Sequence, residues 1–128
     1  MAGDNRDAGA AAGLLLTLLS LNAAKRSDLA GAQALIRENR PHVVFLQEVG
    51  PNAPLLNIAT AAGYRTWLST APGVRRTTAI LSRVPDTQVV EVQPGFSQLA
   101  TIGPLHFINL HLPSGTNAGQ VQIGRAHV

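Results

Sequence analysis

The sequence has no cysteine and few aromatic residues, which make up 4% of its 128 positions. Without cysteine the chain has neither disulfide bonds nor thiolate metal sites, and a reducing compartment is compatible with it. Charged residues are also scarce, at 13% compared with about 25% in an average globular domain. Hydrophobic residues, by contrast, make up 45% of the chain. This balance favours short strands buried in a sheet over a long charged helix or a disordered acidic tail.

The positive charge of the chain is small, with a formal net charge of +3 and arginine at every basic position except Lys25. Such a surplus is compatible with a partner that bears phosphate groups, but it is far from the dense basic stripe of a sequence-reading DNA module. Charge alone favours the simpler explanation, which is ordinary surface arginines.

One apolar segment, Ala8–Ala24, has the composition of a targeting signal but not its pattern. Polar residues interrupt it, and Asp4 and Asp7 precede it where a signal peptide carries positive charge. It is also too short for a membrane span. We therefore predict a buried strand that begins near Leu14 after a flexible leader, residues 1–13, and no membrane partner. Without a signal peptide, the nucleus or the cytoplasm is the default compartment.

Proline and glycine divide the rest of the chain into short apolar segments. Two of these segments have helical spacing and the others are strand-like. The expected helices run from Ser27 or Asp28 to the residue before Pro41 and from Pro54 to Ala62, and the expected strands cover residues 14–22, 42–49, 64–69, 77–83, 88–92, 98–102 and 105–112. The strand–helix–strand opening requires a crossover and hence a parallel pair. The order predicts an α/β fold with a mixed sheet in a layered domain.

A carboxylate, Glu48, ends the most apolar of the expected strands, in the segment HVVFLQEVG. Open α/β sheets place their ligand crevice at the carboxyl ends of strands. A carboxylate held there is a hard oxygen ligand suited to Mg²⁺ or Mn²⁺. The alternative is a strand-end glutamate that faces water, and position alone does not decide between the two.

Asn22 and His111 occupy similar places at the ends of two other apolar strands. An amide can orient a metal-bound carboxylate or contact a phosphate oxygen, although asparagine is also a common turn former. A histidine can donate to a phosphate or protonate a leaving oxygen, although a lone histidine on a strand is more often structural. Asn109, two residues earlier on the same face, could orient the ring of His111. Because strand ends on one edge of a sheet can converge, Asn22, Glu48 and His111 together favour a phosphodiesterase site.

Five segments of the sequence form a series: TLLSLNA, PHVVFLQEV, GYRTWLS, RTTAILSR and LHFINLHLPSG. In order and approximate spacing they resemble the endonuclease/exonuclease/phosphatase superfamily, which includes DNase I, abasic-site endonucleases, sphingomyelinases and the endonuclease domains of non-LTR retrotransposons. The resemblance extends from Leu15 to about Asn117, and FLQEV is its most specific part. It implies the amino-terminal half of a DNase I-like layered α/β sandwich over residues 14–118, with a mixed sheet and helices on one face.

The resemblance also implies roles for the three strand-end residues. Glu48 matches the family's metal-binding glutamate, which implies Mg²⁺ or Mn²⁺ as cofactor, and Asn22 matches the asparagine that helps to hold the phosphate and the metal. His111 matches a position that is histidine in DNase-like and sphingomyelinase-like members and usually tyrosine in abasic-site endonucleases. The segment PSGTN that follows leans toward retrotransposon endonucleases. The implied function is metal-dependent phosphodiester hydrolysis, with DNA as partner, by a nicking endonuclease associated with a reverse transcriptase.

Two alternatives stay open beside this function: a phospholipid or inositol-phosphate phosphodiesterase of the same fold, with which His111 is compatible, and a translated remnant without activity. The sequence departs from the family at Ala24, where abasic-site endonucleases carry an acid, and at Arg76, where DNase I has a catalytic glutamate. After Ser114 it has neither the GDFN element nor the SDH-like element that supply the water-activating aspartate and histidine. We therefore predict that the chain as given is inactive.

The end of the chain, residues 119–128, lacks hydrophobic periodicity, and we predict a tail that lies outside the domain and packs against nothing. Its last part, IGRAHV at 123–128, matches one reading frame of a common sequencing-library adapter. We therefore expect residues 123–128 to be adapter-derived. The alternative is an accidental match at a natural terminus.

Overall fold

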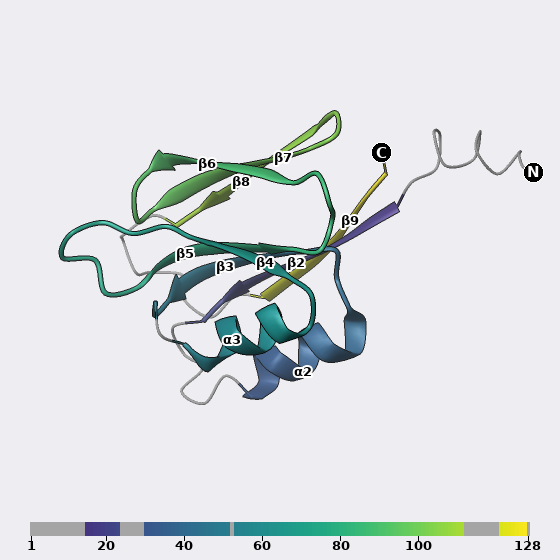
Figure 1. The fold of residues 1–128 in the computed structure, drawn as a ribbon, viewed down its shortest axis with the longest axis horizontal. Helices are drawn as coiled ribbons and strands as arrows, with labels where there is room; N and C mark the ends of the chain where they lie inside the picture. The colour runs from purple at the N-terminus through teal and green to yellow at the C-terminus, as the bar shows by residue number, and fades with distance from the viewer. Residues whose placement is uncertain (1–14, 24–29, 52, 112–120, 128) are drawn as a thin grey trace, which may run out of the picture.

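The structure is a computed structural model that describes residues 15–23, 30–51, 53–111 and 121–127. Helices and strands alternate in the first half of the chain, and strands follow one another in the second half (Figure 1). The elements are β2 (Leu15–Asn22), α2 (Ala30–Asn39), β3 (Val43–Val49), α3 (Pro54–Ala61), β4 (Arg65–Leu68), β5 (Thr77–Ser82), β6 (Gln88–Gln93), β7 (Ser97–Ile102), β8 (Leu105–Leu110) and β9 (Val121–His127). Each predicted helix and strand is present over nearly the same residues, and β9 is an additional strand.

The strands form two sheets. The five-stranded sheet has the order β4-β5-β3-β2-β9, and the three-stranded sheet has the order β6-β7-β8. In the first sheet β2 and β3 are parallel, with Asn22 opposite Gln47, and the other pairs are antiparallel. The predicted mixed sheet and its crossover helix are confirmed. The separate second sheet is not predicted by the sequence, because hairpin connections specify local pairing but not the sheet that a hairpin joins.

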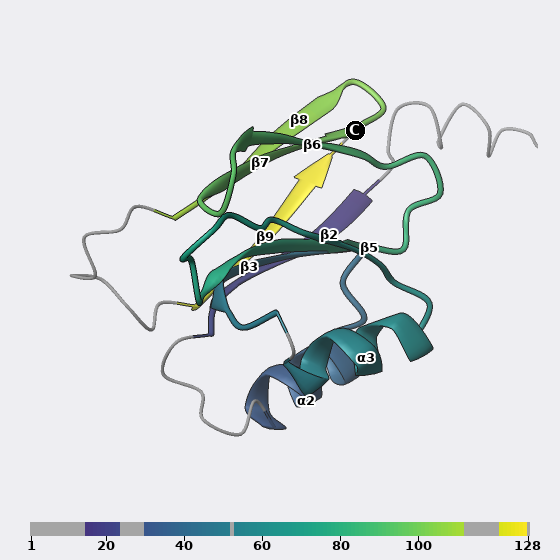
Figure 2. The same cartoon turned by 60° about the vertical axis from the view of Figure 1, so that its left-hand side comes forward.

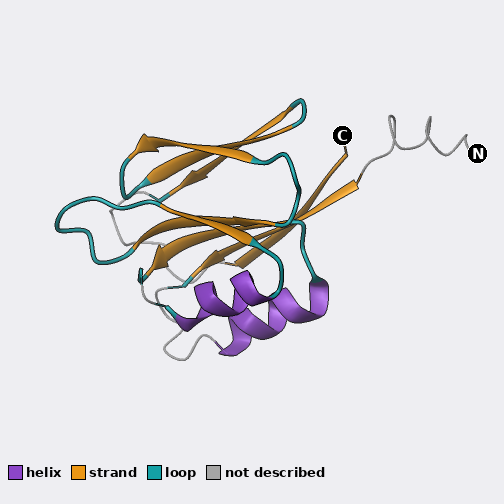
Figure 3. Ribbon diagram, viewed as in Figure 1, coloured by secondary structure: helices purple, strands orange, loops and turns teal. Residues whose placement is uncertain are grey.

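The two sheets stack face to face, and α2 and α3 cover the outer face of the five-stranded sheet (Figure 2, Figure 3). This arrangement confirms the expected layered α/β sandwich with helices on one face. Side chains of β3 alternate between two cores, with Val44 and Leu46 under the helices and Val43 and Phe45 between the sheets. The sheet–sheet core also contains Leu16, Ile80, Ala100 and Ile102.

The helix α2 packs through a narrow apolar side, on which Ala32 and Ile36 are buried one turn apart. Its last carbonyl groups need partners from outside the helix. The guanidinium of Arg83 supplies one at Arg40, where Nη2 donates to the carbonyl oxygen at 2.7 Å. Of the helices that the structure describes, neither α2 nor α3 has the length and apolar character needed to cross a membrane.

The prediction of a tail that packs against nothing is wrong for Val121–His127, because this segment forms β9 and pairs antiparallel with β2 from Leu15 to Leu21. The backbone N–H and C=O groups at the edge of β2 can pair with almost any extended segment, and hydrophobic periodicity carries no signal for that. The other tail positions and the predicted leader, residues 1–13, lie outside the described residues. The adapter origin of 123–128 stays a prediction.

Candidate functional site

The carboxyl ends of β2 and β3 bring two of the predicted site residues together, and the residue after β8 supplies the third. Nδ2 of Asn22 donates to Oε2 of Glu48 at 3.0 Å. Nε2 of His111 lies 3.1 Å from the same oxygen. The predicted clustering of Asn22, Glu48 and His111 at one edge of the sheet is therefore found, while their chemical roles stay predictions.

A β-bulge in β3 turns Glu48 out of the helix-covered core. In a regular strand Glu48 would share the face of Val44 and Leu46, which lies under the helices. Instead, the pairing with β5 shifts register between Leu46 and Val49, and Val49 takes the place under the helices. The backbone of Glu48 has a φ of +53°, a conformation that costs a non-glycine residue about 1–3 kcal/mol and is often found at functional sites. The bulge thus leaves the carboxylate at the strand end.

The site is partly shielded from water. The side chains of Glu48 and His111 retain 14% and 19% of their exposure, and Asn22 is buried. The second carboxylate oxygen, Oε1, lies 4.0 Å from Nη1 of Arg76, whose side chain is 60% exposed. One carboxylate therefore receives an amide, an imidazole and, more loosely, a guanidinium.

A buried amide network lies behind this cluster, between the two sheets. Nε2 of Gln47 donates to Oδ1 of Asn109 at 2.8 Å and to Oγ of Ser20 at 3.3 Å. Nδ2 of Asn109 donates to the carbonyl oxygens of Leu46 at 3.1 Å and Ala79 at 3.0 Å. These bonds join β8 to β3 and β5 beside the bulge, and Gln47 also joins β3 to β2. The network therefore ties together the three strand ends that carry the site.

The prediction that Asn109 orients the ring of His111 is wrong. Its side chain is buried, and its four hydrogen bonds go to Gln47, Gln98 and the carbonyl groups of Leu46 and Ala79. Side chains alternate along a strand, so Asn109 and His111 would share a face only if the strand continued. The strand β8 ends at Leu110, and the alternation ends with it.

Comparisons with known proteins bear on the fold that carries this site. No protein-family model matches the sequence, and no curated protein matches it. Among solved structures, an AP endonuclease from Archaeoglobus fulgidus is 23% identical with a TM-score of 0.58, over 78% of this chain and 42% of that one. A 3'-5' exonuclease (NExo) from Neisseria meningitidis is 19% identical with a TM-score of 0.58, over 78% and 43%. Truncated TDP2 from Caenorhabditis elegans is 24% identical with a TM-score of 0.55, over 80% and 48%.

The chain has the DNase I-like fold. These neighbours all have the fold of the endonuclease/exonuclease/phosphatase superfamily, which confirms the fold that the sequence resemblance implied. The chain spans less than half the length of each of these three structures, between 42% and 48%. At this level of identity the likeness concerns the fold, and it leaves the chemistry of the strand-end cluster to be argued from the cluster itself.

The donors at this end of the DNase I-like sheet fit a hard divalent cation in kind but not in number. Carboxylate and amide oxygens, as in Glu48 and Asn22, are ligands that Mg²⁺ accepts. Mg²⁺ takes about six ligands, however, and water and substrate oxygens commonly complete the set. Within the described parts of the chain, no group of three or more histidine, aspartate or glutamate side chains could hold a metal ion. The site is thus a partial ligand set built on one carboxylate.

Two residues of the site were missed by the sequence analysis. Gln47 carried a signal that could have found it, because an amide within a buried strand needs hydrogen-bond partners and therefore indicates a polar contact across the sheet. Arg76 appeared only as a departure from DNase I. Its approach to Glu48 depends on the path of the β4–β5 connection, for which the sequence has no simple signal.

Proposed function

We propose that the chain provides the amino-terminal part of a metal-dependent phosphodiesterase that hydrolyses nucleic acid. The observation that carries the proposal is the carboxylate of Glu48, directed to the strand ends by a strained bulge and contacted by both Asn22 and His111. Strained backbone conformations gather at functional sites, and open α/β sheets bind their ligands at the carboxyl ends of strands. Both features fit a ligand role for Glu48, whose side chain is largely shielded from water.

Each residue has a role that follows from its contacts. Glu48, assisted by the amide oxygen of Asn22, would hold Mg²⁺ or Mn²⁺. A bound divalent cation polarises the phosphate and stabilises the leaving oxygen. The hydrogen bond from Nδ2 of Asn22 to Oε2 fixes the orientation of the carboxylate, as partners behind a metal ligand commonly do. Nε2 of His111 lies 3.1 Å from Oε2 of Glu48, and it would donate to a phosphate oxygen in place of that carboxylate oxygen.

DNA is the substrate that the comparisons favour. The NExo structure from Neisseria is described as a 3' phosphatase bound to a product DNA hairpin, and a TDP2 structure from D. rerio contains a single-strand DNA product. The finer proposal, a DNA-nicking endonuclease associated with a reverse transcriptase, rests on the sequence PSGTN, which lies outside the described residues. Recovery of a reverse transcriptase in the same reading frame would test that origin.

The chain as given should bind the metal weakly and should not nick DNA. Its sequence after Ser114 contains neither GDFN nor an SDH-like element, the two elements that the family resemblance implies for activation of the attacking water. A longer gene product that carries both elements should nick supercoiled plasmid with Mg²⁺. There, Glu48→Gln should lower the rate at least about a hundredfold, a loss typical for a group that stabilises transition-state charge.

The test uses metal binding and nicking in parallel. Electron paramagnetic resonance of Mn²⁺ should detect binding to the chain as given, and Glu48→Gln should abolish it. Glu38→Gln, which changes an exposed carboxylate on α2, is the matched control and should change neither readout. Mn²⁺ binding that is the same in Glu48→Gln and in the unchanged chain would refute the proposal.

A further inference from the structure

We propose that Arg76 is a phosphate-binding residue of this site, paired with Glu48 until a divalent cation takes the carboxylate. The inference rests on the proposed function for its metal and adds a second ligand group, the phosphodiester oxygens. The starting observation is that Arg76 approaches Oε1 of Glu48, whereas Asn22 and His111 both contact Oε2. The guanidinium therefore lies on the carboxylate oxygen that its other partners leave accessible.

The backbone beneath Arg76 is anchored while its side chain is exposed. The next residue, Thr77, is buried and opens β5. Its hydroxyl donates to the carbonyl oxygens of Ser69 and Gly95. The side chain of Arg76 is 60% exposed, so the guanidinium can leave Glu48 without any change in the fold. A side chain with a fixed backbone and an exposed guanidinium group can exchange one partner for another.

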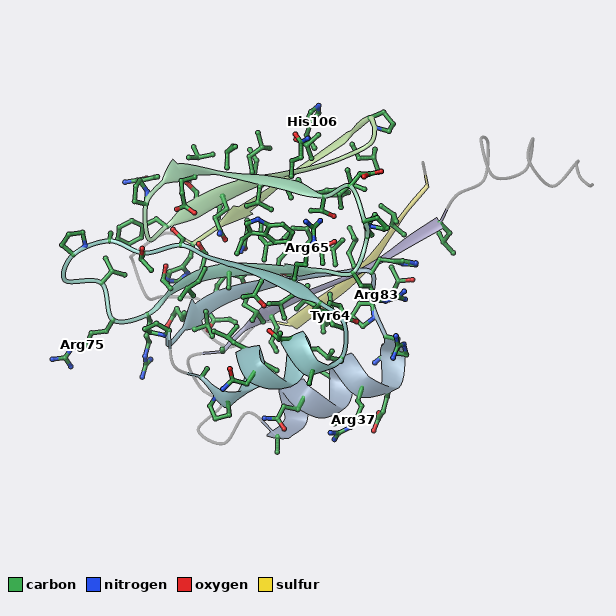
Figure 4. The ribbon with its side chains drawn as sticks, viewed as in Figure 1. Arg37, Tyr64, Arg65, Arg75, Arg83 and His106 are labelled. Carbon is green, nitrogen blue, oxygen red and sulfur yellow. The ribbon has the colours of Figure 1, made fainter. Side chains whose placement is uncertain are left out.

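Arg76 differs in this respect from its neighbour. Arg75 is exposed and lies at the outer end of the β4–β5 connection, with its side chain directed away from the two sheets (Figure 4). Among the described residues, Arg75 has no ion pair with Glu48, whereas Arg76 has one. The two arginines are identical in charge and side-chain type and adjacent in the chain, which makes Arg75 a matched control for Arg76.

The ion pair of Arg76 is weak enough to exchange. A separation of 4.0 Å on an exposed side chain corresponds to a contribution of about 1 kcal/mol or less. A divalent cation on Glu48 would repel the guanidinium and release it. Guanidinium groups bind phosphate through two parallel hydrogen bonds, which a released Arg76 can form beside the donor of His111. The same carboxylate thus cannot hold both cations, and the metal favours phosphate binding.

This exchange has a thermodynamic consequence that can be measured without turnover. Coupling between two sites is reciprocal, so removal of Glu48 should affect phosphate binding through Arg76, and removal of Arg76 should affect metal binding through Glu48. Without metal, Glu48→Gln should tighten binding of inorganic phosphate about two- to fivefold, the range expected from loss of an exposed ion pair. In the Arg76→Gln background the same substitution should have a much smaller effect.

The experiment is a double-mutant cycle on the chain as given, followed by NMR titration with inorganic phosphate and with a short single-stranded oligodeoxynucleotide. Arg76→Gln alone should weaken binding of both probes and tighten Mn²⁺ binding about two- to fivefold. Arg76→Lys keeps the charge but not the two-pronged donor. It should leave Mn²⁺ affinity near that of the unchanged chain and still weaken phosphate binding.

Two controls separate a specific effect from general charge. Arg75→Gln should leave Mn²⁺ affinity and the double-mutant cycle for phosphate binding unchanged. Arg37→Gln on α2, in the helical layer of the fold (Figure 4), should change neither. Equal effects of Arg75→Gln and Arg76→Gln would overturn the proposal, as would a Glu48→Gln effect that persists fully without Arg76. If the unchanged chain binds no Mn²⁺, the proposed function fails, while the metal-free cycle still decides the role of Arg76.

Discussion

A histidine lies at each end of the β2–β3 pair, His42 just before β3 and His111 just after β8 of the other sheet, and the two have opposite kinds of partner. At the amino end of β3, Nδ1 of His42 accepts a hydrogen bond from the backbone N–H of Thr17 at 3.0 Å. At the carboxyl end, Nε2 of His111 faces the carboxylate of Glu48 at 3.1 Å. Each histidine has a proline within two residues, Pro41 and Pro113 respectively. Residue type alone therefore does not show which histidine is structural and which is part of a site.

The difference shows that the partner decides what a strand-end histidine can do. A nitrogen that accepts from a backbone amide must be unprotonated, so His42 closes its end of the sheet as a neutral ring. Burial, and secondarily the positive charge of Arg83, lower the pKa of His42 below its ordinary value of 6.5. Nε2 of His111 instead faces a carboxylate oxygen, which can only accept, so this nitrogen is placed as a donor at the end of the sheet where Glu48 lies. The structural interpretation that the sequence left open for His111 is the one that describes His42.

The largest expected effect comes from breaking the network that holds the carboxyl end together. Asn109→Leu should lower the free energy of unfolding by about 2 kcal/mol, because it removes several buried hydrogen bonds and leaves Gln47 without its amide partner. It should also disturb the contact between His111 and Glu48, since the network fixes β8 against the bulge. Urea unfolding measures the first effect, and the ¹⁵N resonances of the His111 ring report the second.

A second substitution on β8 separates an effect on the position of His111 from an effect on the stability of the fold. Phe107 lies on β8, and its ring packs against that of Phe45 in the other sheet. Phe107→Leu should therefore destabilise the fold by about 1 kcal/mol. It does not touch the amide network and should leave the His111 resonances in place. His111 resonances that move equally in both variants would mean that Asn109 acts only through stability. In every case the His42 ring, at the other end, should be unaffected.

Much of the fold follows from local pattern. Helix and strand positions were predicted because proline, glycine and apolar periodicity act within a few residues. The clustering of Asn22, Glu48 and His111 was predictable too, because parallel strands joined by a crossover bring their carboxyl ends to one edge. The side chains of β3 that enter the helix-covered core follow from the alternation along that strand alone. In each case a short-range signal and a general rule of sheet geometry are sufficient.

The remaining features depend on contacts between distant segments. The positive φ of Glu48 has no sequence signal, because glutamate is an uncommon residue in that conformation. The stacking of β8 on β3 decides that Asn109 meets Gln47 and not His111. Pairing of β9 with β2 uses backbone groups, which every residue carries. These features come from register and stacking between distant segments, which local patterns in the sequence do not reveal.

A smaller effect is expected at the amino end when β9 is shortened. Deletion of residues 123–128 removes the partners of Leu15–Leu19 and leaves Ser20 and Leu21 paired with Gln122 and Val121. The free energy of unfolding should fall by about 1 kcal/mol, and amide exchange should quicken at the His42 end and not at the Asn22 end. An unchanged free energy of unfolding after the deletion would show that β9 contributes nothing to stability, which is what the prediction of an unpacked tail requires.

The same deletion also allows a test of the predicted adapter origin of residues 123–128. Pairing through the backbone is tolerant of sequence, so β9 can be adapter-derived and still pair. Replacement of residues 123–128 by a different strand-forming hexapeptide should then restore most of the lost stability, whereas a proline inserted in that segment should not. Restoration by the original sequence alone would argue for a native segment and against the adapter.

The smallest expected effect is a change of stability with pH that originates at His42. Because its pKa is lower in the folded chain than in the unfolded chain, the unfolded state takes up a proton first as the pH falls below about 6.5. Stability should therefore be unaffected well above that pH, decline as the pH falls through it, and level off below the lowered pKa of the folded state.

His42→Asn keeps an acceptor for the amide of Thr17 but does not titrate, so its stability should decline less over the same range. Arg83→Gln removes the second cause of the shift and should narrow the range without abolishing it. Urea unfolding between about pH 7.5 and pH 5 compares the slopes, and parallel curves for His42→Asn and the unchanged chain would show that the acid sensitivity of the fold arises elsewhere.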